Sequence, residues 1–185
     1  MSGLAPHVIA GALTAADCGR IIALALDGPL SAGGLVGGVA NEGIRRAELA
    51  WLDEREGAAW VGDRLAAIVA QANREAFGFD IDDLAESPQA ARYGAGPRGH
   101  FHWHSDIGRS GVAARRKLTV VVQLSDPAGY DGGLLETWGG AEPEAAPRTR
   151  GTAIVFPSFL LHRVTPVTRG ERWSLTIWAH GPAFR

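Results

Sequence analysis

The sequence predicts a single, mainly β domain, a sandwich or jelly roll with N-terminal helices bracing its outer face. A chain of 185 residues suits one domain with a substantial core. Helical apolar spacing is confined to the first half, whereas short β-like runs separated by Gly, Pro and Asp follow one another from Leu84 onward. The 25 glycines lie at turns without a fixed period, which favours a strand-rich fold over a repeat protein.

The first helix is predicted to begin after Thr14. This residue is followed by an acid at Asp17, the pattern of a helix N-cap, and the Ala/Leu/Ile-rich run continues to about Asp27. Gly28-Pro29 then ends the helix, because proline cannot continue it. We expect a glycine loop at residues 33–38.

A strand at residues 44–52 and a second helix at residues 56–77 are expected next. Apolar residues of this helix recur at three- and four-residue steps, so they form one buried stripe suited to packing against a sheet. The stripe consists of Trp60, Val61, Leu65, Ile68, Val69, Ala72 and Ala76.

Seven short strands are expected in the second half, joined by a turn at residues 126–133 and a surface loop at residues 139–147. No boundary interrupts the chain, so residues 1–185 are predicted to form one domain, with residues 1–83 as a helical support region and residues 84–185 as the β core. The predicted strands are Ala90–Tyr93, Phe101–His104, Lys117–Leu124, Leu134–Thr137, Thr152–Phe156, Leu160–Thr165 and Arg172–His180.

Composition argues against several classes of partner and location. The net charge is −2 and the longest basic run is Arg115-Arg116-Lys117, so we expect no nucleic-acid or membrane-surface partner. The single cysteine, Cys18, cannot form an intramolecular disulfide, which fits a reducing compartment. The N-terminal residues do not resemble a signal peptide, and no apolar run reaches about 18 residues. A cytoplasmic protein is therefore expected.

One eight-residue stretch near the middle of the chain holds three of the six histidines and an aspartate. In an extended strand, His102, His104 and Asp106 would point one way, and Phe101 and Trp103 the other. A neutral imidazole and a carboxylate separated by one residue can bind the same cation, so His104 and Asp106 are the preferred ligands. A polar surface loop would account for the pattern equally well.

A third ligand has to come from downstream, where the candidates are His162 and His180. A His-x-Asp pair with one distant histidine has the composition of the two-histidine, one-carboxylate triad, which leaves coordination positions open on non-haem Fe(II). His162 lies in an otherwise apolar strand, and there it could instead be a core histidine with a satisfied hydrogen bond.

An arginine near the C-terminus indicates an anion. Arg172, Ser174 and Thr176 share one face of a predicted strand whose other face is apolar. A guanidinium that points into a sheet interior is costly unless an anion meets it, and its fork suits a carboxylate. The Arg-x-Ser pair therefore predicts a bound carboxylate, unless the arginine lies on an edge strand and faces solvent.

Six motifs occur in order between residues 90 and 180. They are Tyr93-Gly94-Ala95-Gly96, Trp103-His104-Ser105-Asp106, the run from Arg116 to Pro127, Tyr130-Asp131-Gly132-Gly133, Phe156-Pro157-Ser158 with His162, and Arg172-Trp173-Ser174-Leu175 with Trp178. This ordered set resembles the catalytic domain of Fe(II)- and 2-oxoglutarate-dependent dioxygenases, most closely the prolyl-hydroxylase-like, PKHD-type branch. The helical N-terminal half resembles the family only in general layout.

The resemblance implies a double-stranded β-helix, the cupin-like form of a jelly roll. It implies Fe(II) held by His104, Asp106 and His162. It also implies 2-oxoglutarate as cosubstrate and ascorbate as a possible reductant.

For 2-oxoglutarate, the resemblance implies that Arg172 pairs with its distal carboxylate, that Ser174 donates a hydrogen bond and that Tyr93 contributes to the same pocket. Prolyl hydroxylases often have lysine where this chain has Arg172, so the resemblance leaves proline open as the substrate.

The implied reaction hydroxylates an unactivated C–H and releases succinate and CO2. The substrate would be an amino-acid residue in a protein or peptide, a free amino acid or a related metabolite. The alternative is a cupin-like module that binds or senses the metal or 2-oxoglutarate without turnover.

The glycine-containing, cationic segment Ile107–Arg116 is expected to be either a lid over an acidic or peptide substrate or a solvated loop. Trp138 is expected to line a pocket, whereas His100 and His102 are expected to be exposed polar residues.

Overall fold

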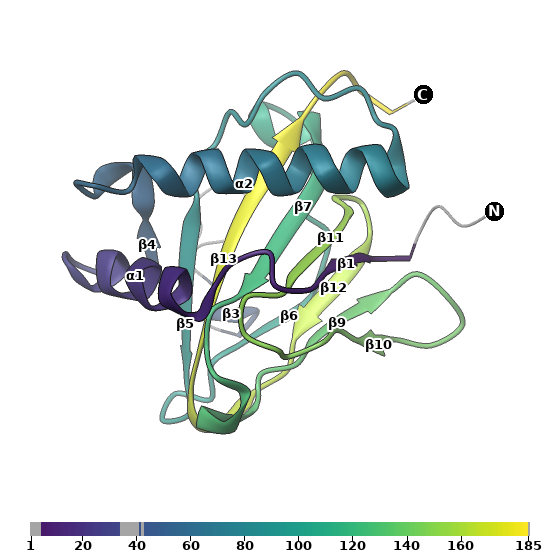
Figure 1. Cartoon of the computed structure of the whole chain (residues 1–185). Helices are drawn as coiled ribbons and strands as arrows, with labels where there is room; N and C mark the ends of the chain where they lie inside the picture. Colours follow the sequence, from purple (N-terminus) through teal and green to yellow (C-terminus); the bar gives the residue numbers. More distant parts are fainter. Residues whose placement is uncertain (1–4, 34–40, 42, 185) are drawn as a thin grey trace.

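The computed structural model describes residues 5–33, 41 and 43–184, and it consists of two β-sheets with helices on one outer face (Figure 1). The expected glycine loop at residues 33–38 lies outside the described residues, apart from Gly33. The major sheet has eight strands, in the order β1 (His7–Ile9), β11 (Ala153–Pro157), β7 (Arg116–Gln123), β13 (Val167–His180), β5 (Gln89–Gly94), β4 (Glu48–Trp51) and β2 (Ser31–Ala32), with β8 (Tyr130–Gly132) paired to β13.

The minor sheet has five strands and faces the major sheet. Its order is β10 (Glu144–Ala145), β9 (Leu135–Trp138), β12 (Leu161–Val164), β6 (His100–His104) and β3 (Arg45–Arg46). Apolar residues of both sheets, such as Tyr93 of β5 and Val164 of β12, pack together between them. The architecture is a double-stranded β-helix, which confirms the predicted fold class.

Helix α1 (Ala15–Leu26) begins as the sequence predicts. The Thr14 side chain accepts a hydrogen bond from the main-chain N–H of Asp17, and the Asp17 carboxylate accepts one from the main-chain N–H of Thr14. Such a reciprocal capping box satisfies two N–H groups that a helix otherwise leaves without partners. The helix buries Cys18, Ile21 and Ala25 on one face.

Helix α2 (Ala59–Ala72) carries most of the predicted apolar stripe. Val61, Leu65, Ile68, Val69 and Ala72 are buried. Trp60 is only partly buried, and the prediction that Ala76 lies in the stripe is wrong, because Ala76 is exposed. The reason is a turn of π-helix at Asn73–Phe77, whose wider winding changes the angular spacing of side chains after Ala72.

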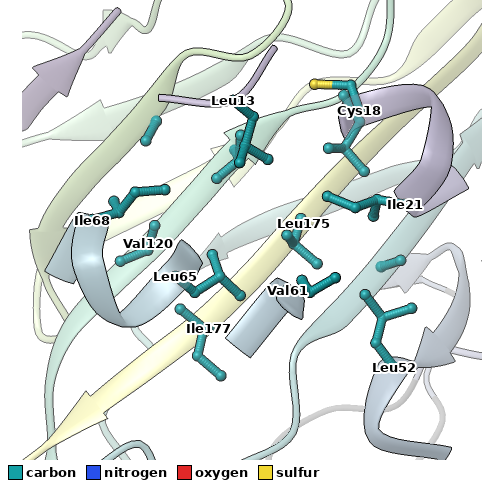
Figure 2. Close-up of a cluster of buried hydrophobic side chains, with 14 of the residues drawn as sticks. Leu13, Cys18, Ile21, Leu52, Val61, Leu65, Ile68, Val120, Leu175 and Ile177 are labelled. Carbon is teal, nitrogen blue, oxygen red and sulfur yellow. The ribbon is translucent and has the colours of Figure 1, made fainter. Parts of the chain in front are cut away.

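The largest core cluster lies between these helices and the major sheet (Figure 2). Leu175 and Ile177 of β13 and Val120 of β7 meet Ile21 of α1 and Leu65 of α2 there. The predicted alternation along β13 is therefore confirmed on its apolar side. The opposite face of β13 points into the space between the two sheets.

All seven strands predicted after Leu84 are present. Their bounds agree with the prediction to within one residue, except that β13 begins at Val167 rather than Arg172. The predicted strand at residues 44–52 is instead two strands in different sheets, because β3 pairs with β6 and β4 pairs with β5. The sequence analysis did not anticipate the short strands β1, β2, β8 and β10.

Residues before Leu84 contribute four of the strands, β1 to β4, as well as both α-helices. The segment expected as a turn at residues 126–133 contains a short 3-10 helix, Pro127–Gly129, followed by β8. Among the described residues, none of the helices has both the length and the apolar character needed to cross a membrane.

The core beneath α2 gives a stability prediction. Leu65→Ala removes a fully buried side chain from the interface of helix and sheet, so we expect the free energy of unfolding to fall by about 2–5 kcal/mol. Leu26→Ala is the matched control, because Leu26 is 54% exposed at the end of α1 and its loss is expected to cost less than about 0.5 kcal/mol. Urea denaturation measures both, and equal losses would contradict the packing described.

Candidate metal centre and its cavity

Three of the predicted site residues meet between the sheets. His162 of β12 is paired directly with His104 of β6, and Asp106 follows β6 by two residues. The Nε2 atom of His104 lies 3.6 Å from Oδ1 of Asp106, and that of His162 lies 3.5 Å from Oδ2. The three potential ligand atoms all lie within 4.8 Å of one another. The structure thus brings together His104, Asp106 and His162, although His104 and His162 are 58 positions apart in the sequence.

The hydrogen bonds of the two imidazoles leave the correct nitrogen atoms for a metal. Nδ1 of His104 lies 2.7 Å from the main-chain oxygen of His102, and Nδ1 of His162 lies 3.0 Å from that of Leu160. Because a carbonyl oxygen only accepts, each Nδ1 carries the hydrogen and donates it. In a neutral imidazole this leaves Nε2 as the nitrogen with a free electron pair, and both Nε2 atoms face Asp106, which is the arrangement that a bound cation requires.

The charges of the cluster also suit a divalent cation. Burial alone would raise the pKa of Asp106, but the facing imidazoles of His162 and His104 and the hydrogen bond from Trp178 lower it to about 2. Burial, with a smaller contribution from His162, lowers the pKa of His104 to about 4. At neutral pH, Asp106 is ionised and His104 is neutral, so neither has to lose a proton when a metal binds. The donor set fits Fe(II).

Asp106 is held by residues far from it in the sequence. Thr119 Oγ1 and Trp178 Nε1 donate to its Oδ2 atom at 2.8 and 2.9 Å, which leaves Oδ1 to face His104. Arg116 Nη1 donates to the main-chain oxygen of Asp106 at 2.9 Å, and the Arg116 guanidinium stacks on the Trp178 ring at 4.0 Å. The sequence analysis assigned no role to these donors, because only tertiary structure brings them to the carboxylate.

His180, the other candidate for the third ligand, lies outside the cluster. It is fully buried, its Nδ1 atom accepts a hydrogen bond from the main-chain N–H of Ala85, and its Nε2 atom lies 2.8 Å from Glu86. Glu86 also forms a two-pronged ion pair with Arg116. Burial alone would raise the pKa of Glu86, but Arg116 and His180 hold it below its ordinary value. His180 thus helps to anchor the arginine that supports Asp106.

The predicted side-chain alternation along β6 is wrong at Phe101. Its ring stacks on the imidazole of His104, with 3.5 Å between centroids, and it lines the cavity, whereas His102 is exposed. Opposite β12, His104 pairs with His162 and Phe101 pairs with Val164, so three residue steps on β6 match two on β12. The extra residue is a β-bulge, which resets the alternation.

The cluster lines a cavity of about 820 Å³ that also contains the three predicted anion-binding residues. Arg172, Ser174 and Tyr93 come from the central strands of the major sheet, and all three are buried. Thr176 lines the same cavity, which confirms the predicted polar face of β13. The structure thus gathers the three preferred metal ligands and the three candidate anion-binding residues around one space.

Arg172 is fully buried and its contacts are neutral. Nε and Nη2 both donate to Oε1 of Gln123, at 3.2 and 2.9 Å, and Nη1 lies 3.4 Å from the Ser174 hydroxyl. In the part of the chain that the structure describes, no carboxylate forms an ion pair with it. Burial lowers the pKa of Arg172, while Tyr93 and Tyr130 oppose this shift. A buried guanidinium with neutral partners fits an anionic ligand, such as the carboxylate of 2-oxoglutarate. The sequence analysis did not identify Gln123.

Two other expectations concern residues near the cavity. Trp138, which is expected to line a pocket, does not line this cavity: it is 44% exposed and packs against Trp103, with 5.5 Å between ring centroids. From the segment after Asp106, the side chains of Arg109, Ser110 and Val112 line the cavity and are exposed. This segment therefore borders the cavity where it meets solvent.

Comparisons with known proteins agree with this geometry. The family model of the 2OG-Fe(II) oxygenase superfamily matches residues 88–180. The chain is 44% identical over 64 residues to a PKHD-type hydroxylase of Teredinibacter turnerae, covering 35% of this chain and 28% of that protein. It is 37% identical over 103 residues to a PKHD-type hydroxylase of Sphingopyxis alaskensis, covering 54% and 46%. The match therefore spans less than half the length of these relatives.

Solved structures share the fold. A Pseudomonas putida prolyl-4-hydroxylase is similar with a TM-score of 0.73 and 24% identity, covering 96% of this chain and 94% of that chain. A Trichoplax adhaerens prolyl hydroxylase in complex with a peptide fragment of hypoxia inducible factor has a TM-score of 0.77 and 17% identity, covering 95% and 83%. The family model covers just over half of the chain and includes the His-Asp-His cluster and Arg172, so the chain belongs to the 2OG-Fe(II) oxygenase superfamily.

Proposed function

We propose that the protein is a Fe(II)- and 2-oxoglutarate-dependent hydroxylase. Its substrate would be an unactivated C–H of an amino-acid residue in a peptide or protein, or of a free amino acid or related metabolite. The observation that carries the proposal is one cavity that contains both a His-Asp-His cluster and the buried guanidinium of Arg172. The cluster suits a divalent metal and the guanidinium suits a carboxylate. A bound 2-oxoglutarate would contact both the metal and Arg172.

In this proposal, His104, Asp106 and His162 hold Fe(II). When bound together, the metal and 2-oxoglutarate would supply the reaction with O2, in which one oxygen atom enters succinate as CO2 is released and the other becomes the hydroxyl group of the substrate. The protein contributes orientation, because the Nδ1 hydrogen bonds of the two histidines fix their rings. Thr119 and Trp178 keep the Asp106 carboxylate ionised and in place.

Arg172 would bind the distal carboxylate of 2-oxoglutarate, assisted by the Ser174 hydroxyl. The Tyr93 ring lies 5.5 Å from the guanidinium and closes one side of this space. Because Gln123 Oε1 accepts from Nε and Nη2 on one edge, the guanidinium is oriented before any ligand binds. Such preorganisation reduces the entropic cost of binding.

Several broader expectations accompany this proposal. We propose that the chain works as one domain, with residues 1–83 supporting a catalytic core at residues 84–185, because both helices pack on the major sheet. A peptide substrate is supported by the peptide bound to the Trichoplax prolyl hydroxylase. A cytoplasmic location and ascorbate as reductant stay predictions from the sequence.

Substitution of the metal ligands tests the proposal directly. His104→Ala and Asp106→Asn are expected to weaken Fe(II) binding by more than about 100-fold and to abolish Fe(II)-dependent conversion of 2-oxoglutarate to succinate. His102→Ala is the matched control, because it removes an exposed histidine from the same strand. Metal content after reconstitution and succinate formation are the measurements.

Two outcomes would contradict the proposed function. Unchanged succinate formation in the ligand variants would overturn the assignment of the metal site. If the unmodified protein bound Fe(II) and 2-oxoglutarate but failed to decarboxylate across a broad panel of amino acids and peptides, a binding or sensing module would replace the enzyme.

Substitution of Gln123 tests the role of Arg172 in binding 2-oxoglutarate. Gln123→Glu places a carboxylate where the amide oxygen contacts the guanidinium, so the new carboxylate would form an ion pair with Arg172. This ion pair is expected to weaken 2-oxoglutarate binding by about 10–100-fold. Gln123→Met, which removes the contact without adding charge, is expected to have a smaller effect. Anaerobic titration of the Fe(II) protein, followed by its charge-transfer absorption, measures the affinity. Equal affinity in Gln123→Glu and the unmodified protein would exclude Arg172 as the partner of the cosubstrate.

A further inference from the structure

A buried side-chain amide in the cavity wall has a donor group without a partner. Gln89, the first residue of β5, is 4% exposed and lines the cavity. Its Oε1 atom accepts a hydrogen bond of 2.7 Å from Nη2 of Arg45. Because a guanidinium only donates, this contact fixes the orientation of the amide and turns Nε2 away from Arg45. No described residue accepts a hydrogen bond from Nε2, so this donor is available to a ligand in the cavity.

Gln89 lies in a row of four residues that crosses the inner face of the major sheet. It pairs with Trp51 of β4 on one side and with Thr176 of β13 on the other, and Thr176 pairs with Val121 of β7. Directly paired residues lie side by side on one face, and all four line the cavity. The Thr176 hydroxyl is likewise without a hydrogen-bond partner among the described residues. An amide donor and a hydroxyl therefore adjoin each other between an aromatic and an aliphatic side chain.

This row lies beside the proposed cosubstrate pocket. Arg172 turns its guanidinium toward Gln123 on β7, the neighbour of β13 on one side, whereas Gln89 projects from β5, the neighbour on the other side. Thr176 lies two residues from Trp178, whose indole donates to the carboxylate of the metal cluster. A ligand that contacts Gln89 can therefore lie near the metal while 2-oxoglutarate occupies its own pocket.

The cavity reaches solvent beyond this row. Ser31 and Ala32 of the edge strand β2 line the cavity and are exposed, and β2 pairs with β4, the strand that carries Trp51. These three residues lie outside residues 88–180, which the family model matches. This side of the cavity is thus built by a part of the chain that does not carry the shared chemistry, as expected for a wall that selects the substrate.

The carboxylates of the cavity argue against a free amino acid as the substrate. Only two line the cavity in the described part of the chain, Asp106 and Glu86. The first belongs to the metal cluster, and the second already pairs with Arg116 and His180. The ammonium group of a free amino acid would lose water without gaining a carboxylate, which is costly. A neutral amide avoids this cost, and its carbonyl oxygen can accept from Nε2 of Gln89.

We propose that Gln89, Thr176 and Trp51 form a subsite that binds a neutral amide group of the substrate. Nε2 of Gln89 donates to the amide oxygen, the Thr176 hydroxyl accepts from the amide N–H, and Trp51 provides an apolar wall. The inference rests on the proposed function and narrows its substrate class to amino-acid units that contain an amide. The amide is either the main-chain amide of a peptide or the side-chain amide of Asn or Gln, and Gln89 recognises the same group in both.

The test uses neutral peptide probes and a binding signal that does not depend on turnover. The probes are capped tripeptides Ac-Gly-Xaa-Gly-NH2, in which Xaa is Asn, Gln or their apolar isosteres Leu and Met, and the same four amino acids in free form. Each probe is added to the full chain loaded with Mn(II) and 2-oxoglutarate. Paramagnetic relaxation of the probe protons by Mn(II) then reports both binding and closeness to the metal.

We expect the capped peptides to bind at least about tenfold more tightly than the free amino acids, and Gln89→Glu to abolish this preference. Gln89→Glu keeps the size of the side chain and its acceptor for Arg45, but it replaces the donor with an oxygen that repels a carbonyl group. Gln89→Met, which is uncharged, is expected to weaken peptide binding about tenfold as well. Gln71→Glu is the matched control, because it adds the same charge on α2, outside the cavity.

The peptide series separates the two sources of the amide. If the Asn or Gln peptide binds more tightly than its Leu or Met isostere, and Gln89→Glu removes the difference, the subsite takes a side-chain amide. If all four peptides bind equally and all are weakened by Gln89→Glu, it takes a main-chain amide.

Four results would overturn the proposal: free amino acids that bind as tightly as the peptides, peptide binding that is unchanged in both Gln89 variants, no binding by any probe, or a loss of 2-oxoglutarate affinity in Gln89→Met, which would assign Gln89 to the cosubstrate. The affinities for Mn(II) and 2-oxoglutarate are measured separately for each variant. If the unmodified protein binds both but shows no preference for peptides, the subsite assignment fails and the proposed hydroxylase function stands.

Discussion

A carboxylate kept ionised between two sheets is the interaction on which the rest of the site depends. Asp106 is buried, and an isolated buried charge is too costly to persist. Its stability requires hydrogen-bond donors and imidazoles from other strands, supplied by Thr119 of β7, Trp178 of β13 and His162 of β12. The fold is therefore not a passive support for the candidate metal centre, because Asp106 can stay charged when buried only if both sheets supply its partners.

The two faces of β13 connect the hydrophobic core to the chemistry. Leu175 and Ile177 are fixed beneath the helices, whereas Arg172 and Ser174 on the opposite face line the cavity. Because adjacent residues of a strand point to opposite faces, the packing beneath the helices also fixes the position of the guanidinium. The minor sheet contributes differently: its candidate ligands His104 and His162 face the cavity, and it has exposed side chains on its outer surface.

Local signals in the sequence were enough for much of the fold and for part of the site. The Thr14–Asp17 capping box and the alternation along β13 are set by neighbouring residues, so both were predictable. The His-x-Asp spacing likewise indicated two ligands, but spacing alone did not choose between His162 and His180. The family resemblance indicated His162, and strand register brings it beside His104. Contacts that exist only through tertiary packing could not be predicted, among them those of Gln123 with Arg172 and of Arg45 with Phe101.

The bulge in β6 has a consequence for protein engineering. In a regular strand, Phe101 and His104 would lie on opposite faces, and the ring that stacks on His104 would point away from the cavity. A designer who transferred the ligands to an idealised sheet would therefore reproduce the His-Asp-His cluster but lose its aromatic partner. The irregularity would have to be transferred as deliberately as the three candidate ligands, because one additional residue of backbone determines what surrounds the cluster.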